Sequence, residues 1–179
     1  EEQMNIDVVS CGEIYTAASV GFPMERSFFH GNNKSDGDIR FAIENKVGFF
    51  VADSMDEIYA ISRIAKQNEI TQKILLRVTP GIDTHTHQKI STGNVDSKFG
   101  IAISTGQAIE AVKEILKTEN ISLCGFHCHI GSQIFESEPF ITASSVMLEF
   151  IKQVKDELNY TAEMLNLGGG FGVRYLESQ

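Results

Sequence analysis

The sequence contains no tryptophan, and only three prolines and three cysteines occur among its 179 residues. Three cysteines cannot all pair, and two of them, Cys124 and Cys128, lie in one apolar segment. We therefore expect free thiols and a reducing compartment, which indicates the cytoplasm. Basic residues are also scarce: 15 Lys and Arg against 24 Asp and Glu give a net charge of −9, which argues against a nucleic-acid-binding face.

Two further absences concern targeting. No apolar run approaches the roughly 20 residues of a membrane-spanning helix. No segment has the composition of a signal peptide, and the chain starts at Glu1 rather than at a methionine. The sequence is therefore interpreted as a fragment, and neither a membrane-spanning helix nor a signal peptide is expected within it.

Hydrophobic periodicity predicts six strands that alternate with five helices. Ser10 and Ser54, each followed three residues later by a glutamate, predict capping boxes at two helix starts, and Ser35 or Asp36 is the predicted cap of a third helix. The strands are apolar on both faces, which is typical of parallel strands covered by helices. A (β/α)8 barrel of about 250 residues uses roughly 31 residues for each strand-helix unit, so 179 residues make nearly six units. The predicted strands are Ile6–Val9, a strand beginning at Phe28, Val47–Ala52, Ile74–Val78, a strand beginning at Leu123, and Met164–Leu167. The predicted fold class is α/β, an incomplete TIM-type barrel formed by a single domain over residues 1–179.

The strand that begins at Leu123 leads into a turn rich in polar groups. Period-two alternation places His127 and His129 on one face, with the cysteines on the other. The following Gly131 and Ser132 offer a close-approach backbone and a hydroxyl, an arrangement that suits a flat ring with a phosphate tail. Two other interpretations remain open: a core strand with hydrogen-bonded histidines, and a zinc site. The alternation argues against zinc, because ligands on opposite faces cannot close one tetrahedron.

A second strand end carries three consecutive glycines, Gly168, Gly169 and Gly170. Glycine permits positive φ angles and lets backbone N–H groups crowd around an anion. The run could equally be a simple turn.

Six segments, taken in order, resemble the fold-type III pyridoxal-phosphate-dependent decarboxylases, and within them the enzymes that act on diaminopimelate. The resemblance covers nearly the whole chain. The matching segments are DVVSCGE at 7–13, FFHGNNK at 28–34, ILLRVTPG at 74–81, SKFGI at 97–101, HIGSQ at 129–133 and NLGGGFG at 166–172.

The resemblance implies a pyridoxal 5'-phosphate cofactor and assigns roles to individual residues. His129 would stack on the cofactor ring, and Ser132 with Gly168, Gly169 and Gly170 would hold its phosphate. Catalytic roles are implied for His129, Asp7 and Arg77, the last two as an acidic–basic couple at the floor of the site. Asp7 could instead only neutralise a buried Arg77. No role is assigned to His127, and no metal is expected.

Subunit contacts are also implied. Lys98 matches a lysine at the dimer contact of related decarboxylases, although it could simply be an exposed charge, and the implied full-length enzyme is a homodimer. The segment Thr79–Gly100 is long for a loop. It is either a solvated excursion or, by the resemblance, a part of the active-site mouth and subunit contact. The motif from Asp83 to His87 lacks neighbours that would complete a metal site.

The sequence departs from the family in three places. The Schiff-base lysine of the family precedes the position of Asp7, and Glu1–Ile6 contains no lysine. The eighth-strand acid and the C-terminal β domain would follow Gln179. We therefore expect the first and eighth strands to lie outside this chain, and the chain alone to be inactive.

The expected parent enzyme is a carboxy-lyase of lysine biosynthesis that converts meso-diaminopimelate to L-lysine and CO2. Gln133, after the His-Ile-Gly-Ser sequence, favours this substrate. The alternatives are a decarboxylase of ornithine or arginine, a non-catalytic barrel that binds pyridoxal phosphate, and an unrelated barrel that binds a sugar phosphate.

Overall fold

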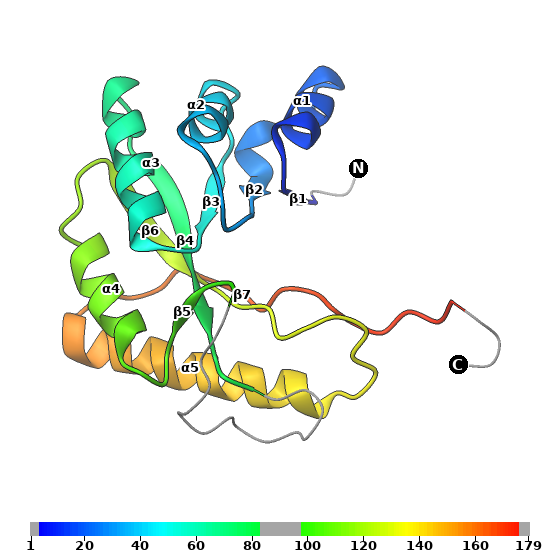
Figure 1. Ribbon diagram of the computed structural model, residues 1–179. Helices are drawn as coiled ribbons and strands as arrows, with labels where there is room; N and C mark the ends of the chain where they lie inside the picture. Colours follow the sequence, from blue (N-terminus) through cyan, green and yellow to red (C-terminus); the bar gives the residue numbers. More distant parts are fainter. Residues whose placement is uncertain (1–3, 83–97, 176–179) are drawn as a thin grey trace.

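The structure is a computed structural model of the chain and describes residues 4–82 and 98–175 (Figure 1). Six parallel strands form one sheet, and their spatial order is their order in the sequence. These strands are β1 (Ile6–Val8), β2 (Ser27–Phe29), β3 (Phe49–Ala52), β4 (Gln72–Thr79), β6 (Ile121–His127) and β7 (Met164–Asn166). The predicted sequential parallel order is confirmed. The sequence did not predict β5 (Ile101–Ala102), which pairs only with the last residues of β4.

Five α-helices and one short 3-10 helix connect the strands. They are α1 (Cys11–Ser19), η1 (Met24–Arg26), α2 (Asp36–Glu44), α3 (Met55–Gln67), α4 (Gln107–Ile115) and α5 (Glu138–Leu158). The first three α-helices begin where serine predicts, because the hydroxyls of Ser10, Ser35 and Ser54 each accept an N–H of the first turn. At α1 and α3 the predicted capping boxes are each wrong in one half, and at α1 the carboxylate of Glu13 accepts the N–H of Val9 instead of that of Ser10. The carboxylate of Glu57 bonds the N–H of Asp53 instead of that of Ser54.

Two apolar clusters lie on the two faces of the sheet. The larger one packs the helices against the strands and includes Ile39, Ile58 and Met147. The smaller one lies on the other face of the sheet and consists of Phe28, Val51, Leu75 and Cys124, with Phe49 and Met164 packed against it. Both faces of the strands are therefore apolar, as the sequence indicates.

A β-bulge in the β4–β6 pair changes which face each residue of β6 occupies. Ile74 pairs with Leu123 whereas Leu75 pairs with Gly125, so Cys124 is an extra residue in β6. Cys124 therefore belongs to the smaller cluster, whereas Cys128 belongs to the larger one. The prediction that the two cysteines share a face is wrong, because strict alternation does not hold across a bulge.

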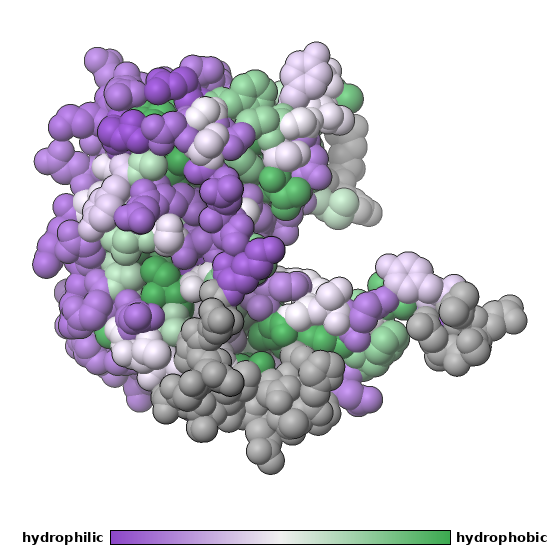
Figure 2. All heavy atoms as spheres, in the orientation of Figure 1, coloured by the Kyte–Doolittle hydropathy of each residue, from purple (hydrophilic) through white to green (hydrophobic). Residues whose placement is uncertain are grey.

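The sheet curls about its concave face and leaves that side open. Helices α1, α2 and α3 stand beside one another along the convex side, and α5 crosses below (Figure 1). The space-filling view shows a broad hollow between the region of β1 and the C-terminal segment (Figure 2). The architecture is a parallel half-barrel, which confirms the incomplete TIM-type fold. In the described part of the chain, no helix is both long and apolar enough to cross a membrane.

Candidate functional site

Polar side chains gather where the parallel strands end. Asp7 lies on β1, His30 and Asp53 directly follow β2 and β3, Arg77 lies near the end of β4, and His127 ends β6. Carboxyl ends of parallel strands meet at one edge of a sheet, and in barrels the chemistry lies at that edge. The structure therefore brings together residues that are far apart in the sequence.

The glycine run after β7 packs against the turn after β6. Gly168 and Gly170 have φ angles of +72° and +98°, a region that favours glycine. A Cβ on Gly170 would lie 1.9 Å from the carbonyl oxygen of Gly131, whereas a Cβ on Gly169 would meet nothing within 4 Å. Within the described residues, the N–H groups of Gly169 and Gly170 donate no hydrogen bond. The run is thus a close-packed loop that presents free N–H groups, which is what an anion requires.

His129 and Ser132 lie beside this loop. A Cβ on Gly168 would lie 3.0 Å from Nδ1 of His129, so the imidazole is in contact with the glycine run. Partial burial lowers the pKa of His129, and the positive charge of Arg77 lowers it further. Both His129 and Ser132 are exposed, and so are accessible to a ligand.

Two other histidines and Asp7 form a cluster at the ends of β1, β2 and β6. Nε2 of His30 lies 3.3 Å from Oδ1 of Asp7, and the rings of His30 and His127 meet edge to face at 5.0 Å. The contact with His30 is the main reason why the pKa of Asp7 is lowered. His127 is buried, and this burial lowers its pKa to about 3. At neutral pH the cluster therefore holds a carboxylate and an uncharged His127.

Arg77 pairs with Asp53 rather than with Asp7. Its Nη1 lies 3.9 Å from Oδ2 of Asp53, and its guanidinium stacks 4.4 Å from the centre of the Phe99 ring. The arginine does have a carboxylate partner, as its place in an apolar strand indicates, but the predicted partner is wrong. The sheet order explains this result, because β3 is adjacent to β4 whereas β1 is separated from β4 by two strands.

A buried ion pair that is not evident from the sequence lies next to this site. Nζ of Lys34 lies 2.7 Å from Oε1 of Glu57, and the two side chains are only 2% and 6% exposed. The segment that contains Lys34 was recognised, but burial of a lysine cannot be seen in one sequence. The spacing of Glu57 from Ser54 indicates a helix cap, and nothing in that pattern indicates that Glu57 also binds Lys34.

The predicted subunit-contact residue, Lys98, lies at the edge of the described region. Its side chain is exposed, with Nζ 5.3 Å from the Phe99 ring centre, and its carbonyl oxygen accepts a hydrogen bond from Asn32. The motif from Asp83 to His87 lies outside the described residues. Across residues 4–82 and 98–175, no cluster of three or more metal-ligating side chains is present.

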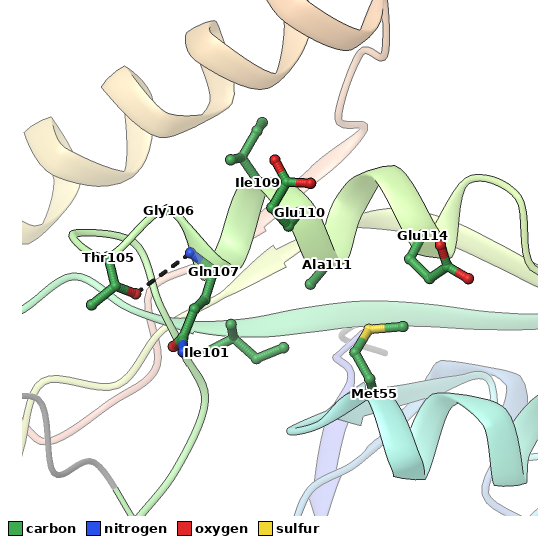
Figure 3. Close-up of a pocket in the computed structure, with 9 residues that line it drawn as sticks. All are labelled: Met55, Ile101, Thr105, Gly106, Gln107, Ile109, Glu110, Ala111 and Glu114. Carbon is green, nitrogen blue, oxygen red and sulfur yellow. Dashed lines mark hydrogen bonds between the residues drawn. The ribbon is translucent and has the colours of Figure 1, made fainter.

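A groove on the outer side of the molecule contains none of the predicted site residues (Figure 3). It lies between the beginning of α3 and α4, and its lining is mostly apolar. The lining residues are Met55, Ile101, Thr105, Gly106, Gln107, Ile109, Glu110, Ala111 and Glu114. With two carboxylates and no basic side chain in its lining, the groove does not suit a phosphorylated ligand.

The known proteins most relevant to this site are decarboxylases that resemble the chain in sequence and in structure. The chain is 45% identical to diaminopimelate decarboxylase of Bacillus subtilis over 177 residues, which is 99% of this chain and 40% of the relative. A crystal structure of diaminopimelate decarboxylase from M. jannaschi superposes with a TM-score of 0.88 at 36% identity, over 98% of this chain and 40% of that one. Lysine/ornithine decarboxylase from Vibrio vulnificus, at 24% identity over 96% of this chain and 41% of that one, shares the fold with a TM-score of 0.76.

The chain spans about 40% of the length of the curated relatives it matches. Within that span, the model of one family, described as "Pyridoxal-dependent decarboxylase, pyridoxal binding domain", matches residues 1–179. The chain therefore belongs to the pyridoxal-dependent decarboxylases, as a part of their pyridoxal-binding domain.

Proposed function

We propose that the protein containing this chain decarboxylates meso-diaminopimelate to L-lysine and CO2 with pyridoxal phosphate as cofactor. The observation that carries the proposal is the 45% identity to a diaminopimelate decarboxylase over 99% of the chain. Because the chain spans 40% of that relative, the activity is proposed for the whole protein.

The described residues fit the phosphate of this cofactor. Gly169 and Gly170 present unused N–H groups at the end of β7, and the exposed hydroxyl of Ser132 lies on the neighbouring turn. The turn and the glycine run are held together, because Ile134 donates its N–H to the carbonyl of Gly170 over 2.9 Å. Phosphate binding by the last barrel loops is usual in this architecture. The loop would thus be organised before the anion arrives.

The other strand-end groups would surround the cofactor ring. His129 would lie against one face of the ring, and it is poorly protonated because burial and Arg77 lower its pKa. Arg77 and Asp53 would place a fixed ion pair at the floor of the site. When bound there, pyridoxal phosphate supplies an electron sink for the electron pair left by the departing carboxylate. Asp7 would remain ionised, because its contact with His30 lowers its pKa.

The proposal includes a cytoplasmic homodimer. The net charge of −9 and the three free cysteines support a reducing, aqueous location. Lys98 is exposed and is the proposed contact with the second subunit.

The test is CO2 release by the complete protein that contains this chain, with meso-diaminopimelate, L-ornithine and L-arginine as competing substrates. We expect L-lysine to form from meso-diaminopimelate at about 1 s⁻¹ or faster, and a His129→Asn variant to lose most of this activity. A Lys113→Met variant, which changes an exposed side chain on α4, is the matched control. Preference for ornithine or arginine would contradict the proposed substrate, and cofactor binding without turnover of any amino acid would contradict the proposed reaction.

A further inference from the structure

The buried pair Lys34–Glu57 has no role in the site described above, yet it is the least exposed ion pair among the described residues. Lys34 donates from Nζ to three acceptors, namely the carbonyls of Gly31 and Val51 and Oε1 of Glu57, at 2.6, 3.0 and 2.7 Å. A buried ion pair of this kind is weak evidence for stability, because desolvating both charges offsets their attraction. We therefore infer the function of the pair from the residues that Lys34 and Glu57 contact.

Glu57 also binds the backbone of Asp53. Its second carboxylate oxygen, Oε2, accepts the backbone N–H of Asp53 over 3.0 Å. This residue directly follows β3, and its side chain is only 4% exposed. The backbone position of Asp53 is thus determined by a carboxylate that Lys34 holds from the neighbouring strand end.

The two carboxylate oxygens of Asp53 face different partners, Gly100 and Arg77. Oδ1 accepts the N–H of Gly100, and Oδ2 faces Nη1 of Arg77 at 3.9 Å without a hydrogen bond. Gly100 in turn packs on Arg77, since a Cβ there would lie 3.3 Å from Cγ of Arg77. Arg77 is therefore held on one side by charge and on the other by the packing of Phe99 and Gly100.

We propose that Glu57, whose buried charge Lys34 balances, is a positioning device for Arg77. Glu57 fixes Asp53, and Asp53 fixes Gly100 and the guanidinium beside His129. The proposal rests on the proposed function, because only a cofactor or substrate in the hollow gives Arg77 something to act upon. Glu57 is a positioning residue and Lys34 balances its buried charge, and neither is assigned a catalytic role because their side chains are only 6% and 2% exposed. The depressed pKa of His129, to which Arg77 contributes, agrees with this placement of the guanidinium.

The test replaces the pair without changing the net charge. In Lys34→Met/Glu57→Met, apolar side chains of similar length fill the same space, a kind of change that buried ion pairs tolerate. In Lys34→Met/Glu57→Gln, the amide oxygen can still accept the N–H of Asp53. The control is Lys113→Met/Glu110→Met, which removes an ion pair of the same charges from the exposed face of α4.

Two nuclear magnetic resonance measurements on the chain report the outcome without any turnover. The first is hydrogen exchange of the Gly100 amide, and the second is the titration of His129, assigned with a His129→Asn variant. For the methionine pair we expect Gly100 to exchange about tenfold faster or more, and the pKa of His129 to rise as Arg77 moves away. For the glutamine variant and the α4 control we expect both quantities to stay near the wild-type values.

Two results overturn the proposal: a folded methionine pair with unchanged Gly100 exchange and His129 pKa, or a glutamine variant as perturbed as the methionine pair. If the methionine pair does not fold, Asp53→Leu tests the link from its other end. Release of Arg77 then raises the pKa of His129, whereas an unchanged or lowered pKa means that Arg77 stays in place and contradicts the proposal. Because neither measurement uses turnover, an incorrect substrate assignment leaves the result unaffected.

Discussion

At the scale of single residues, the absence of a side chain at Gly170 allows the glycine run after β7 to pack against the turn after β6. Gly170 has a φ of +98°, and any Cβ there would meet the carbonyl oxygen of Gly131 at 1.9 Å. Its neighbour Gly169 has neither constraint. The two residues therefore form a matched pair for mutation.

We predict that Gly170→Ala lowers the free energy of unfolding by about 2 kcal/mol or more, because strain and a backbone clash add. Gly169→Ala should change it by less than about 0.5 kcal/mol. Urea unfolding of both variants measures the difference. Equal effects of the two substitutions would mean that the loop is not packed against the Gly131 turn.

His127 gives a second prediction, which concerns pH. Burial lowers its pKa from the ordinary 6.5 to about 3. Between these two pH values, His127 is therefore protonated in the unfolded chain but neutral in the folded chain. Stability from the neutral imidazole is therefore fully present above pH 6.5 and is lost progressively as the pH falls toward 3. The contribution to the slope is at most about 1.4 kcal/mol per pH unit.

A His127→Phe variant should lose this contribution. We expect its free energy of unfolding, measured by urea titration between pH 7 and pH 4, to fall less steeply than that of the wild type. His129→Asn is the control, since His129 is exposed and should affect the slope less. Parallel curves for wild type and His127→Phe would show that His127 takes up a proton in the folded chain.

Residue-level reasoning from the sequence could identify candidates but not their pairing. His129, Ser132 and the glycines were recognised because their backbone chemistry is local. The predicted partner of Arg77 is wrong because the partner depends on which strand lies next to β4. Asp53 follows β3 in a segment where no local pattern marks it as that partner. The burial of Lys34 depends on three acceptors from separate segments, and no local pattern encodes that.

At the scale of the elements, β6 is shaped by its bulge at Cys124 and by Gly125, which follows the bulge. A Cβ on Gly125 would lie 1.8 Å from the carbonyl oxygen of Met164 on β7. The φ of Gly125 is close to extended, so the need for glycine comes from the approach of β7 and not from backbone strain. The bulge also turns Cys124 toward the smaller apolar cluster.

We predict that Gly125→Ala weakens the pairing of β6 with β7 and costs about 2 kcal/mol or more in the free energy of unfolding. Gly12→Ala on α1 is the control, because its nearest neighbour is 3.8 Å away and a helix favours alanine. That variant should be neutral or up to about 1 kcal/mol more stable. Hydrogen exchange of the Phe126 and Cys128 amides checks the cause, since only Gly125→Ala should accelerate it.

The regular elements were largely predictable, since long helices and apolar strands repeat one pattern over many residues. The serine caps of α1, α2 and α3 were evident for the same reason. The two-residue β5 and the bulge were not, because both arise from pairing with β4 and leave no periodic signal.

At the scale of the whole molecule, the sheet is a half-barrel whose β1 and β7 each pair on one side only within the described residues. The hollow between the region of β1 and the C-terminal segment is open in Figure 2. Since the chain spans 40% of its relatives, we expect the rest of the protein to contribute to the site.

We therefore predict that the 179-residue chain alone releases no CO2 from meso-diaminopimelate, even with added pyridoxal phosphate. By the resemblance, the lysine that would hold the cofactor covalently is expected before the position of Asp7, and residues 1–6 contain no lysine. The measurement is CO2 release alongside L-lysine formation. Turnover at about 1 s⁻¹ or faster would mean that another lysine takes over the role.

The central claim is that the loops after β6 and β7 hold the phosphate of pyridoxal phosphate. The most direct test is an amide nuclear magnetic resonance titration of the chain with 4-deoxypyridoxine 5-phosphate, which lacks the aldehyde and cannot react with lysines. We expect saturable shifts centred on Ser132, Gly169 and Gly170, with a shift of the His129 ring signals and no response to deoxypyridoxine without its phosphate. Shifts centred on the groove of Figure 3, or equal binding with and without the phosphate, would contradict it.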